Sequence, residues 1–251
     1  MPADSLAEAV RGLPAPWRGN YFAVVDSTQD VARAAAQDAA PTRSVFVADY
    51  QRAGRGRARR DWLAPAGAAL LMSMLFRERL ETPPISPWRY TSLVSVALLQ
   101  VIDQLQPSPM AAIKWPNDVV LGEGKVAGVL AETRWDGREL QVIVGLGLNV
   151  SAAPDGISDA TFLRAAIDRP LDRGDLLLTF LSHLEALSSE ADGVVHELWE
   201  SRLWRRGQRL RLLDRGVEED VVVLGALRDG SLRVRGRDGQ DRITTTGELL
   251  A

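Results

Sequence analysis

Short apolar runs separated by polar segments organise the first third of the chain. Apolar residues dominate residues 21–25 (YFAVV), 44–50 (SVFVADY) and 68–76 (AALLMSMLF), and runs of this length are typical of β-strands. Residues 26–28 (DST) stand directly before the Ala-rich segment 29–40, in the position of a helix N-cap. The pattern therefore predicts a strand-to-helix junction followed by two further strands.

Two later segments show helical periodicity. Residues 91–106 have apolar positions at helical spacing and a second face that is also apolar, which predicts a buried helix. A second helical stripe consists of Leu177, Phe180, Leu181, Leu184 and Leu187. We expect this second helix to serve core packing and to carry no chemistry.

Residues 111–150 have the pattern of a three-stranded antiparallel meander. Its two turns are expected at residues 122–124 (GEG) and 136–137 (DG), because both contain the glycine that tight hairpins need. Leu121 would then face Lys125 across the first turn, and Trp135 would face Arg138 across the second. This register places Asp118, Gly128 and Gly145 side by side and Lys125 beside Leu148, and a one-residue slip would spoil it.

The pattern changes again near the C-terminal end of the chain. Short strand-like runs follow one another from residue 208 onward, and two Asp-Gly pairs, at 229–230 and 238–239, supply hairpin turns. We expect residues 206–251 to form a small β-barrel of SH3-like size, and residues 1–205 to form the larger domain.

Composition and charge exclude several classes of function. The net charge of −3 gives the 251-residue chain no overall positive field for nucleic acid or acidic membranes. There is no cysteine, which excludes disulfides, thiolate metal sites and cysteine nucleophiles. Both histidines, His183 and His196, lie in helical patterns and are expected to be ordinary helix residues. No signal peptide or membrane-spanning run is present, so we expect a cytoplasmic protein with no membrane association.

A basic, glycine-containing segment follows the second strand. Residues 54–62 (GRGRARRDW) place four arginines among two glycines. Glycines allow close backbone approach to a ligand, and guanidinium groups bind phosphate or carboxylate in bidentate fashion. The segment predicts an anion site, with a solvated basic loop or a nucleic-acid patch as alternatives. Trp62 favours the anion site of a nucleotide, because a purine can stack on an indole.

Polar side chains also interrupt the predicted meander. In residues 114–118 (KWPND), Pro116 marks an edge or a local break that exposes Asn117 and Asp118, although a turn chosen for its geometry is an alternative. Lys125 begins an apolar strand, where alternation puts it on the face of Ala127 and Val129. It can serve a partly apolar site or protect a strand edge against aggregation.

The last predicted strand ends in residues 145–149 (GLGLN). Two glycines in a strand indicate close approach of a ligand or another backbone, and Asn149 can read the edge of a base. Alone, this pattern is weak, because it lacks the strand-to-helix context of a dinucleotide site, and no P-loop spacing is present.

The motifs taken together, and in this order, resemble those of biotin protein ligases. The segments GRGRARRDW, KWPND, KVAGVL and GLGLNV are similar to the family's signature motifs, and DSTQD and ADYQ are similar to its biotin-pocket segments. The resemblance implies an α+β fold: a class II synthetase-like catalytic domain over residues 1–205, with a mixed, largely antiparallel sheet flanked by helices, and an SH3-like β-barrel over 206–251. Two positions depart from the pattern, with Arg59 where a glycine is expected and Gln29 where asparagine is common.

The resemblance implies that ATP activates biotin as biotinyl-5'-AMP, which is transferred to a lysine of a biotin carboxyl carrier protein domain, with Mg²⁺ neutralising the pyrophosphate. The implied catalytic residues are Arg57, Lys125 and Asp118. The implied biotin-binding residues are Ser27, Thr28, Gln29, Gln51, Arg55, Gly56, Arg57, Lys125, Gly128 and Gly145. The implied ATP and adenylate contacts are Arg55, Arg57, Arg60, Trp62, Lys114, Asn117, Lys125 and Asn149. The magnesium ligands are not identified.

Three further points concern partners and alternatives. About twenty residues precede the first predicted strand, too few for a helix-turn-helix module, so we expect no DNA binding. We expect a monomer or a weak dimer. A lipoate protein ligase, which shares the fold and the adenylate chemistry, and a noncatalytic SH3-containing binding protein are the alternative functions.

Overall fold

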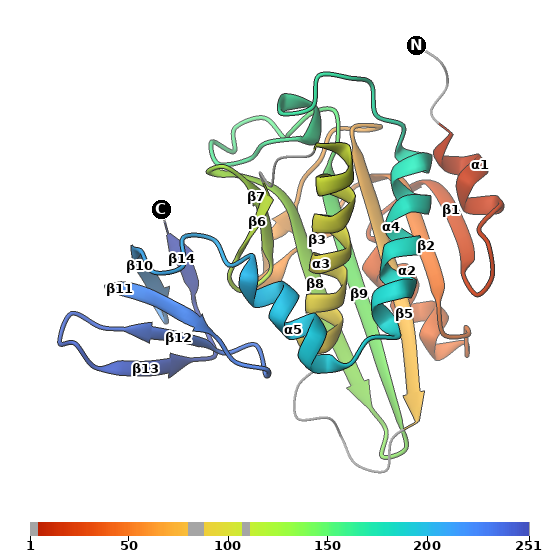
Figure 1. Ribbon diagram of the computed structural model, residues 1–251. Coiled ribbons are helices and arrows are strands. Elements are labelled where there is room, and N and C mark those ends of the chain that lie inside the picture. The colour runs from red at the N-terminus through yellow and green to blue at the C-terminus, as the bar shows by residue number, and fades with distance from the viewer. Residues whose placement is uncertain (1–4, 80–87, 107–110, 251) are drawn as a thin grey trace.

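The computed structural model describes residues 5–79, 88–106 and 111–250 (Figure 1). A large seven-stranded sheet is covered by helices, and a smaller five-stranded sheet lies beside it at the C-terminal end of the chain. The strands of the large sheet are β1 (Arg18–Val25), β2 (Ser44–Gln51), β5 (Ala69–Arg79), β6 (Ala111–Lys114), β7 (Asp118–Leu121), β8 (Gly124–Trp135) and β9 (Glu139–Asn149). The helices are α1 (Leu6–Arg11), α2 (Thr28–Gln37), α3 (Trp88–Leu105), α4 (Arg173–Ser188) and α5 (Asp192–Ser201).

The large sheet has the order β1-β2-β5-β9-β8-β7-β6, in which only β1 and β2 are parallel. The expected mixed, largely antiparallel sheet is therefore confirmed, as are the helices α2, α3 and α4. Ser27 is the N-cap of α2, and its Oγ accepts a hydrogen bond from the backbone N–H of Gln29 at 3.2 Å. Helix α1 was not predicted, whereas the helical patterns around His183 and His196 are confirmed by α4 and α5. Among the described residues, no helix has the length and apolar character to cross a membrane.

The two faces of the sheet carry different helices and different side chains. Helices α3 and α4 lie side by side over one face (Figure 1), where the main core contains Val45, Val47 and Met74. Helix α2 packs on the opposite face against Phe46 and Leu75. Strand alternation separates the two sets, because neighbouring residues of a strand point to opposite faces.

Small residues hollow out part of the α2 face. Ser73, Gly145 and Gly147 point to the side of Leu75, and Gly128 pairs with Gly147 across β8 and β9. Farther along the same face, α2 packs closely against the large side chains of Phe46 and Leu75. The small residues instead leave room for a ligand between the sheet and the segments above it.

The predicted register of the meander is wrong by two residues at its second turn. Trp135 pairs with Leu140 rather than with Arg138, and Gly128 therefore pairs with Gly147 rather than with Gly145. The turn is longer than expected because the Asp136 carboxylate accepts hydrogen bonds from the backbone amides of residues 138 and 139. A two-residue shift keeps the same face, so Gly145 still points to the side of Gly128.

A β-bulge corrects the expected face of Lys125. The pairs Asp118–Gly128 and Val119–Ala127 agree with the prediction, but Val120 pairs with Lys125, so Val126 is an extra residue in β8. The extra residue reverses the alternation at that point, and Lys125 points to the face of Gly128 instead of the core face of Ala127. The expected neighbour Leu148 pairs with Ala127, and Lys125 bridges to Ala160.

The region predicted as three strands contains four. Residues 115–117 form a turn between β6 and β7, which confirms that Pro116 marks a break in the strand. The turn places Asn117 and Asp118 next to the α2 face at the start of β7. Proline cannot donate to a strand ladder, which explains why the ladder is interrupted at this point.

The C-terminal sheet has the order β13-β12-β11-β10-β14 and is antiparallel throughout. Its strands are β10 (Arg209–Asp214), β11 (Val217–Ala226), β12 (Leu232–Arg235), β13 (Asp241–Thr244) and β14 (Glu248–Leu250). The predicted Asp-Gly turns are present, with Gly230 at φ 84° and Gly239 at φ 78°. Within the described residues the two short strands at its edges are not paired with each other, so the expected barrel is an open sheet.

Candidate active site

The arginine-rich segment folds as a short hairpin over the α2 face of the large sheet. Strands β3 (Gly54–Arg55) and β4 (Asp61–Trp62) pair across a 3-10 turn at residues 57–59, and Gly56 N donates to Arg60 O at 2.7 Å. Arg59 has φ 61°, in the left-handed region that favours glycine. The signature motif that this segment resembles has a glycine at this position, in agreement with the left-handed conformation, and the side chain of Arg59 strains the turn by about 1 kcal/mol.

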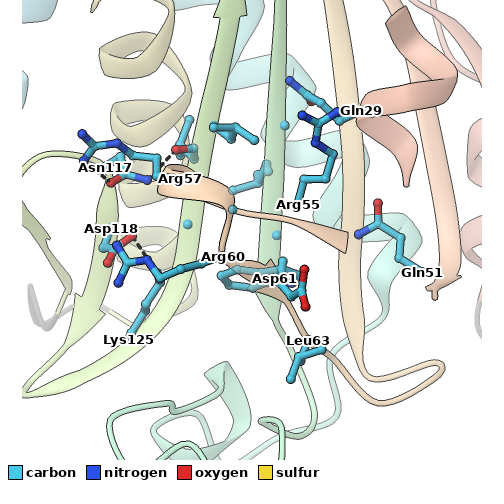
Figure 2. A pocket seen from close by; sticks show the side chains of 18 of the residues that line it. Gln29, Gln51, Arg55, Arg57, Arg60, Asp61, Leu63, Asn117, Asp118 and Lys125 are labelled. Carbon is cyan, nitrogen blue, oxygen red and sulfur yellow. Dashed lines mark hydrogen bonds and ion pairs between the residues drawn. The ribbon is translucent and has the colours of Figure 1, made fainter. Parts of the chain in front are cut away.

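A cavity of about 260 Å³ lies between this arginine loop and the sheet. The predicted residues that line it are Ser27, Thr28, Gln29, Gln51, Arg55, Gly56, Arg57, Arg60, Trp62, Asn117, Asp118, Lys125, Gly128, Gly145 and Asn149. Leu130 adds an apolar side chain to the wall of the cavity, whereas the side chains of Met72, Val129 and Leu146 belong to the main core on the other face of the sheet. Segments separated by more than a hundred residues thus meet at one site, and Figure 2 shows their side chains converging beneath the loop.

One end of the cavity is polar but uncharged. The Gln29 amide nitrogen donates to Glu132 Oε2 at 3.1 Å and to Ile143 O at 3.2 Å, while its oxygen accepts from Ser73 Oγ at 2.9 Å. Gln29 is buried, so both ends of its amide are fixed by partners rather than by water.

Gln51 completes the same end of the cavity. Its Oε1 accepts hydrogen bonds from Thr28 N at 2.7 Å and from Thr28 Oγ1 at 3.0 Å. These bonds turn the Gln51 oxygen toward the start of α2. Donors and acceptors in fixed directions suit a small polar ring that offers both N–H and C=O groups.

The opposite end of the cavity contains cations and one buried carboxylate. Lys125 Nζ lies 2.8 Å from Asp118 Oδ1 and 5.5 Å from the centre of the Trp62 ring. Burial raises the pKa of Asp118, and the positive charge of Lys125 offsets only part of this effect. The paired charges place a potential proton acceptor beside an anion-binding ammonium group.

Two arginines extend this charged end. Arg57 donates to Asn117 Oδ1 at 3.3 Å, and Asn117 is itself fixed because its Nδ2 donates to Val129 O at 2.7 Å. Burial lowers the pKa of Arg57; the charge of Asp118 raises it in part, and the charge of Arg60 lowers it further. The guanidinium nevertheless stays charged. Arg60 pairs with Glu248 of the C-terminal sheet at 2.9 Å. Figure 2 shows Arg57 beside Asn117 on this side of the loop.

Trp62 covers the strand glycines. A Cβ on Gly147 would lie 2.3 Å from Trp62 Cε2, and a Cβ on Gly128 would lie 2.9 Å from Trp62 Cζ3. The close approach that these glycines predict is therefore made by the protein's own indole ring, while Gly145 accommodates the Gln29 oxygen. Gly147 was missed as a site residue, although the repeated glycine in residues 145–149 was the available signal.

Asn149 is a buried polar residue that lines the cavity. Its Nδ2 donates to Thr161 O at 3.0 Å, and its Oδ1 has no hydrogen-bond partner among the described residues. A buried acceptor without a partner is costly, so it is suited to a donor that arrives with a ligand.

Lys114 is the predicted residue that does not line the cavity. It pairs with Asp118 across β6 and β7, and its Nζ lies 5.4 Å from the centre of the Trp204 ring. Lys114 shares a face of the sheet with its partner Asp118, but its side chain extends to Trp204 instead of the cavity. Its charge still acts on Asp118, whose pKa it lowers.

Several side chains at the site escape prediction from sequence, and three of them bind predicted site residues. Ser73 lies in an apolar strand, Glu132 in the middle of β8, and Glu248 in the C-terminal sheet, far from the motifs. For Ser73 and Glu132, the available signal was a polar residue within an otherwise apolar strand. For Glu248, nothing in the sequence indicates its pairing with Arg60.

Comparisons with known proteins agree with this geometry. Residues 21–149 match the model of the Biotin/lipoate A/B protein ligase family. The biotin–[acetyl-CoA-carboxylase] ligase of Mycobacterium tuberculosis is 36% identical over 255 residues, covering 98% of this chain and 94% of that protein. The bifunctional ligase/repressor BirA of Bacillus subtilis is 30% identical, covering 87% of this chain and 72% of that protein.

A solved structure shares the whole architecture. The biotin protein ligase from Aquifex aeolicus in complex with biotin and ATP superposes with a TM-score of 0.75 at 26% identity, over 92% of this chain and 97% of that one. The sequence match, the fold and the residues that meet in the cavity all lead to one assignment: the chain belongs to the biotin/lipoate A/B protein ligase family.

Proposed function

We propose that this protein is a biotin protein ligase that activates biotin with ATP and transfers it to a lysine of an acceptor protein. The observation that carries the proposal is a single cavity with a neutral hydrogen-bonding end at Gln29 and a cationic end at Lys125 and Arg57. Biotin has this polarity, with a ureido ring at one end and a carboxylate at the other. The relatives named as biotin ligases support the same substrate.

Biotin binding follows from the two ends of the cavity. The Gln29 oxygen faces the cavity and accepts from a ureido N–H, while Ser27, Thr28 and Gln51 supply the remaining polar contacts. The apolar walls at Leu130 and beside Gly128 and Gly145 enclose the valeryl chain. Its carboxylate then reaches Arg57 and Lys125 near the Gly56 backbone, whereas a contact of Arg55 with the carboxylate or the phosphates stays a prediction, because Arg55 is paired with Asp30 and Glu132 on the Gln29 side.

Adenylation requires two anions to approach each other. The biotin carboxylate attacks the α-phosphorus of ATP, and pyrophosphate leaves. Arg57 and Lys125 offset the repulsion and the negative charge that develops on the phosphoryl oxygens in the transition state. These cations are already fixed by Asn117 and Asp118, so they need little reorganisation during the reaction.

ATP occupies the side of the cavity near Trp62 and Asn149. The Trp62 indole offers a surface for adenine, and the unpartnered Asn149 Oδ1 accepts from a nucleotide N–H. Arg60 reaches the phosphates once it leaves Glu248. Asn117 acts on the phosphates indirectly, because it holds Arg57. A contact of Lys114 with the adenylate stays a prediction, and the position of Lys114 outside the cavity does not support it.

Mg²⁺ enters with ATP. The described residues contain no group of three or more histidine, aspartate or glutamate side chains that could hold a metal. They do offer Asp159 and Glu248 as single carboxylates at the cavity, which fits an ion that is bound mainly by phosphate oxygens and water. The ion would neutralise the leaving pyrophosphate.

Asp118 serves the second half-reaction. The acceptor lysine must lose a proton before its amine attacks the adenylate carbonyl and releases AMP. Asp118 is a carboxylate beside the reacting anion, and its raised pKa improves its strength as a base. Biotin carboxyl carrier domains are the acceptors of biotin ligases in general, and we infer that such a domain supplies the lysine here.

An ATP–pyrophosphate exchange assay tests the proposal and its alternatives. Exchange that depends on biotin supports the ligase, exchange that depends on lipoate supports a lipoate protein ligase, and no exchange with either supports a noncatalytic binding protein. Incorporation of labelled biotin into a purified carrier domain, with a variant that lacks the acceptor lysine as the control, tests the transfer step.

Two expectations about partners and one about location remain predictions. The absence of DNA binding is tested by a mobility-shift assay with biotin and ATP present, in which tight sequence-specific binding would overturn it. A monomeric or weakly dimeric state is tested by analytical ultracentrifugation. The cytoplasmic location is tested by cell fractionation.

A further inference from the structure

Four charged side chains form a network at the rim of the cavity. Arg55 of the arginine loop pairs with Asp30 of α2 at 2.6 Å and with Glu132 of β8 at 3.3 Å. Arg33 of α2 pairs with the same two carboxylates, at 2.6 Å from Glu132 Oε2. The arginine loop is thereby fastened to α2 and β8 at its biotin side, and Figure 2 shows Arg55 on the Gln29 side of the loop.

Glu132 has a second role in this network. Its Oε2 accepts from the Gln29 amide nitrogen at 3.1 Å, so the same carboxylate touches a buried pocket residue and a loop arginine. A carboxylate only accepts hydrogen bonds, as does Ile143 O, the other partner of that nitrogen. If the side-chain amide of Gln29 were rotated by half a turn, its oxygen would face the oxygens of Glu132 and Ile143, which cannot donate. The Gln29 oxygen is therefore fixed toward Ser73 and the cavity.

We propose that Glu132 is a positioning residue that couples the biotin head-group pocket to the arginine loop. One carboxylate oxygen orients the amide of Gln29, and the other holds Arg55 and with it the biotin end of the loop. Because both tasks use one side chain, head-group binding and loop closure favour each other. The inference rests on the proposed function, since biotin is taken as the occupant of the cavity.

An ordinary ion pair on the protein surface would not couple head-group binding to loop closure. Partly exposed pairs contribute little to stability or function, and the chain offers a matched example in Glu185 of α4, which pairs with Arg43 at 2.8 Å. The two glutamate side chains are similarly exposed, 31% for Glu132 and 35% for Glu185. Glu185 lies outside the residues that line the cavity, so its substitution controls for the loss of an ion pair alone.

The test compares Glu132→Gln, Glu185→Gln and Asp30→Asn in the full-length protein, with folding checked by circular dichroism. Two quantities are measured: the KM for biotin in pyrophosphate exchange, and the rate at which trypsin cleaves within residues 55–60 while biotin is bound. Glu132→Gln should raise the KM about ten-fold and speed cleavage about ten-fold, because a glutamine is uncharged and keeps only one acceptor oxygen, so it cannot hold Gln29 and Arg55 at the same time. Asp30→Asn should speed cleavage but change the KM less than about two-fold, and Glu185→Gln should change neither.

Glu132→Asp provides a second variant, which keeps the charge on a shorter side chain and should recover part of both effects. A Glu132→Gln variant that matches Glu185→Gln in both measurements would overturn the coupling, and so would a rise in KM without faster cleavage. A parent protein without biotin-dependent exchange would instead overturn the proposed function. Tryptic cleavage without ligand still reports whether Glu132 holds the loop, so the two failures are distinguishable.

Discussion

The arginines of the loop differ in what holds them, although they stand in one short run. Arg55 binds acids on α2 and β8, Arg57 binds Asn117 in the turn before β7, and Arg60 binds Glu248 of the C-terminal sheet. The loop is therefore fastened at three points by three different parts of the fold. Each of these three arginines has its own anchor, so substitutions within the loop should have different effects.

Arg57→Ala should release biotinyl-5'-AMP into solution and abolish ligation. Its guanidinium lies in the cavity and closes the loop against Asn117, and without it water reaches the adenylate. Mass spectrometry of free and bound adenylate during turnover measures the leak. Arg59→Ala is the control, because Arg59 is exposed and does not line the cavity. Adenylate retention equal to that of the parent enzyme would contradict this role.

Asp118→Asn should separate the two half-reactions. Pyrophosphate exchange should stay within about three-fold of the parent, whereas transfer to the carrier should fall roughly 100-fold or more, as expected for the loss of a general base. Because burial raises the pKa of Asp118, the parent should lose transfer activity as the pH falls through that raised value, and the asparagine variant should lack this acid limb. Single-turnover transfer from preformed adenylate, measured across the acidic range, tests both points. Equal loss of both half-reactions would refute the assignment.

At the scale of elements, local irregularities decide which side chains reach the site. The bulge at Val126 brings Lys125 to the cavity, and the turn at residues 115–117 exposes Asn117 and Asp118. Helix α4 illustrates the same dependence on local detail, because Asp172 caps its first turn and also binds α1. Its Oδ1 accepts from Asp175 N at 3.0 Å, and its Oδ2 accepts from Ser5 N at 3.0 Å.

Asp172→Asn should lower the free energy of unfolding by about 1 kcal/mol at neutral pH, because asparagine still caps α4 but lacks the negative charge and the second acceptor oxygen that bind Ser5. Burial alone would raise the pKa of Asp172, but the hydrogen bonds from Ser5 hold it below its usual value. The ionised form is therefore favoured by folding, and its contribution is present at neutral pH and disappears as the pH falls through the lowered pKa.

Urea unfolding at neutral pH and in acid measures this difference. The gap between parent and Asp172→Asn should close as the pH falls below the lowered pKa of Asp172, where the carboxylate is protonated in both states. Asp175→Asn is the control, because it removes the same charge from the first turn of α4 while leaving both hydrogen bonds from Ser5 in place. A gap that stays constant with pH would show that the carboxylate charge does not matter.

At the scale of the whole molecule, the C-terminal sheet is anchored to the larger part of the chain. Trp115 Nε1 donates to Gly230 O at 2.9 Å, and a Cβ on Gly230 would lie 2.1 Å from the Trp88 ring. The pair between Arg60 and Glu248 adds a contact at the active site. We propose that residues 1–205 and 206–251 are two domains that work as one unit, because the second holds the loop that closes the first.

Trp115→Phe should lower the melting temperature by roughly 5 to 10 °C. It removes a buried hydrogen bond and leaves a small cavity, a combined loss of about 2 to 3 kcal/mol in a protein of this size. Calorimetry measures the shift, and Trp135→Phe, at the partly exposed end of β8, is the control. An unchanged melting temperature would contradict the anchoring role, and two separate transitions would contradict the single unit.

The sequence by itself determined the class of the fold and most of the site. Apolar periodicity predicts β1, β2, β5 and the central helices, since burial of one face leaves a local signature. The resemblance of the motifs to those of biotin protein ligases implied fifteen of the residues that line the cavity. The left-handed φ of Arg59 likewise explains a departure that was visible from the sequence.

Only the tertiary structure decided how those residues face one another. The bulge at Val126 and the longer turn at Asp136 depend on hydrogen bonds that alternation does not encode, and they determine the direction of Lys125 and the partner of Gly128. Glu132 and Glu248 gain their roles from neighbours far away along the chain. A sequence pattern records whether a residue is buried or exposed, whereas long-range partners arise only when the chain folds.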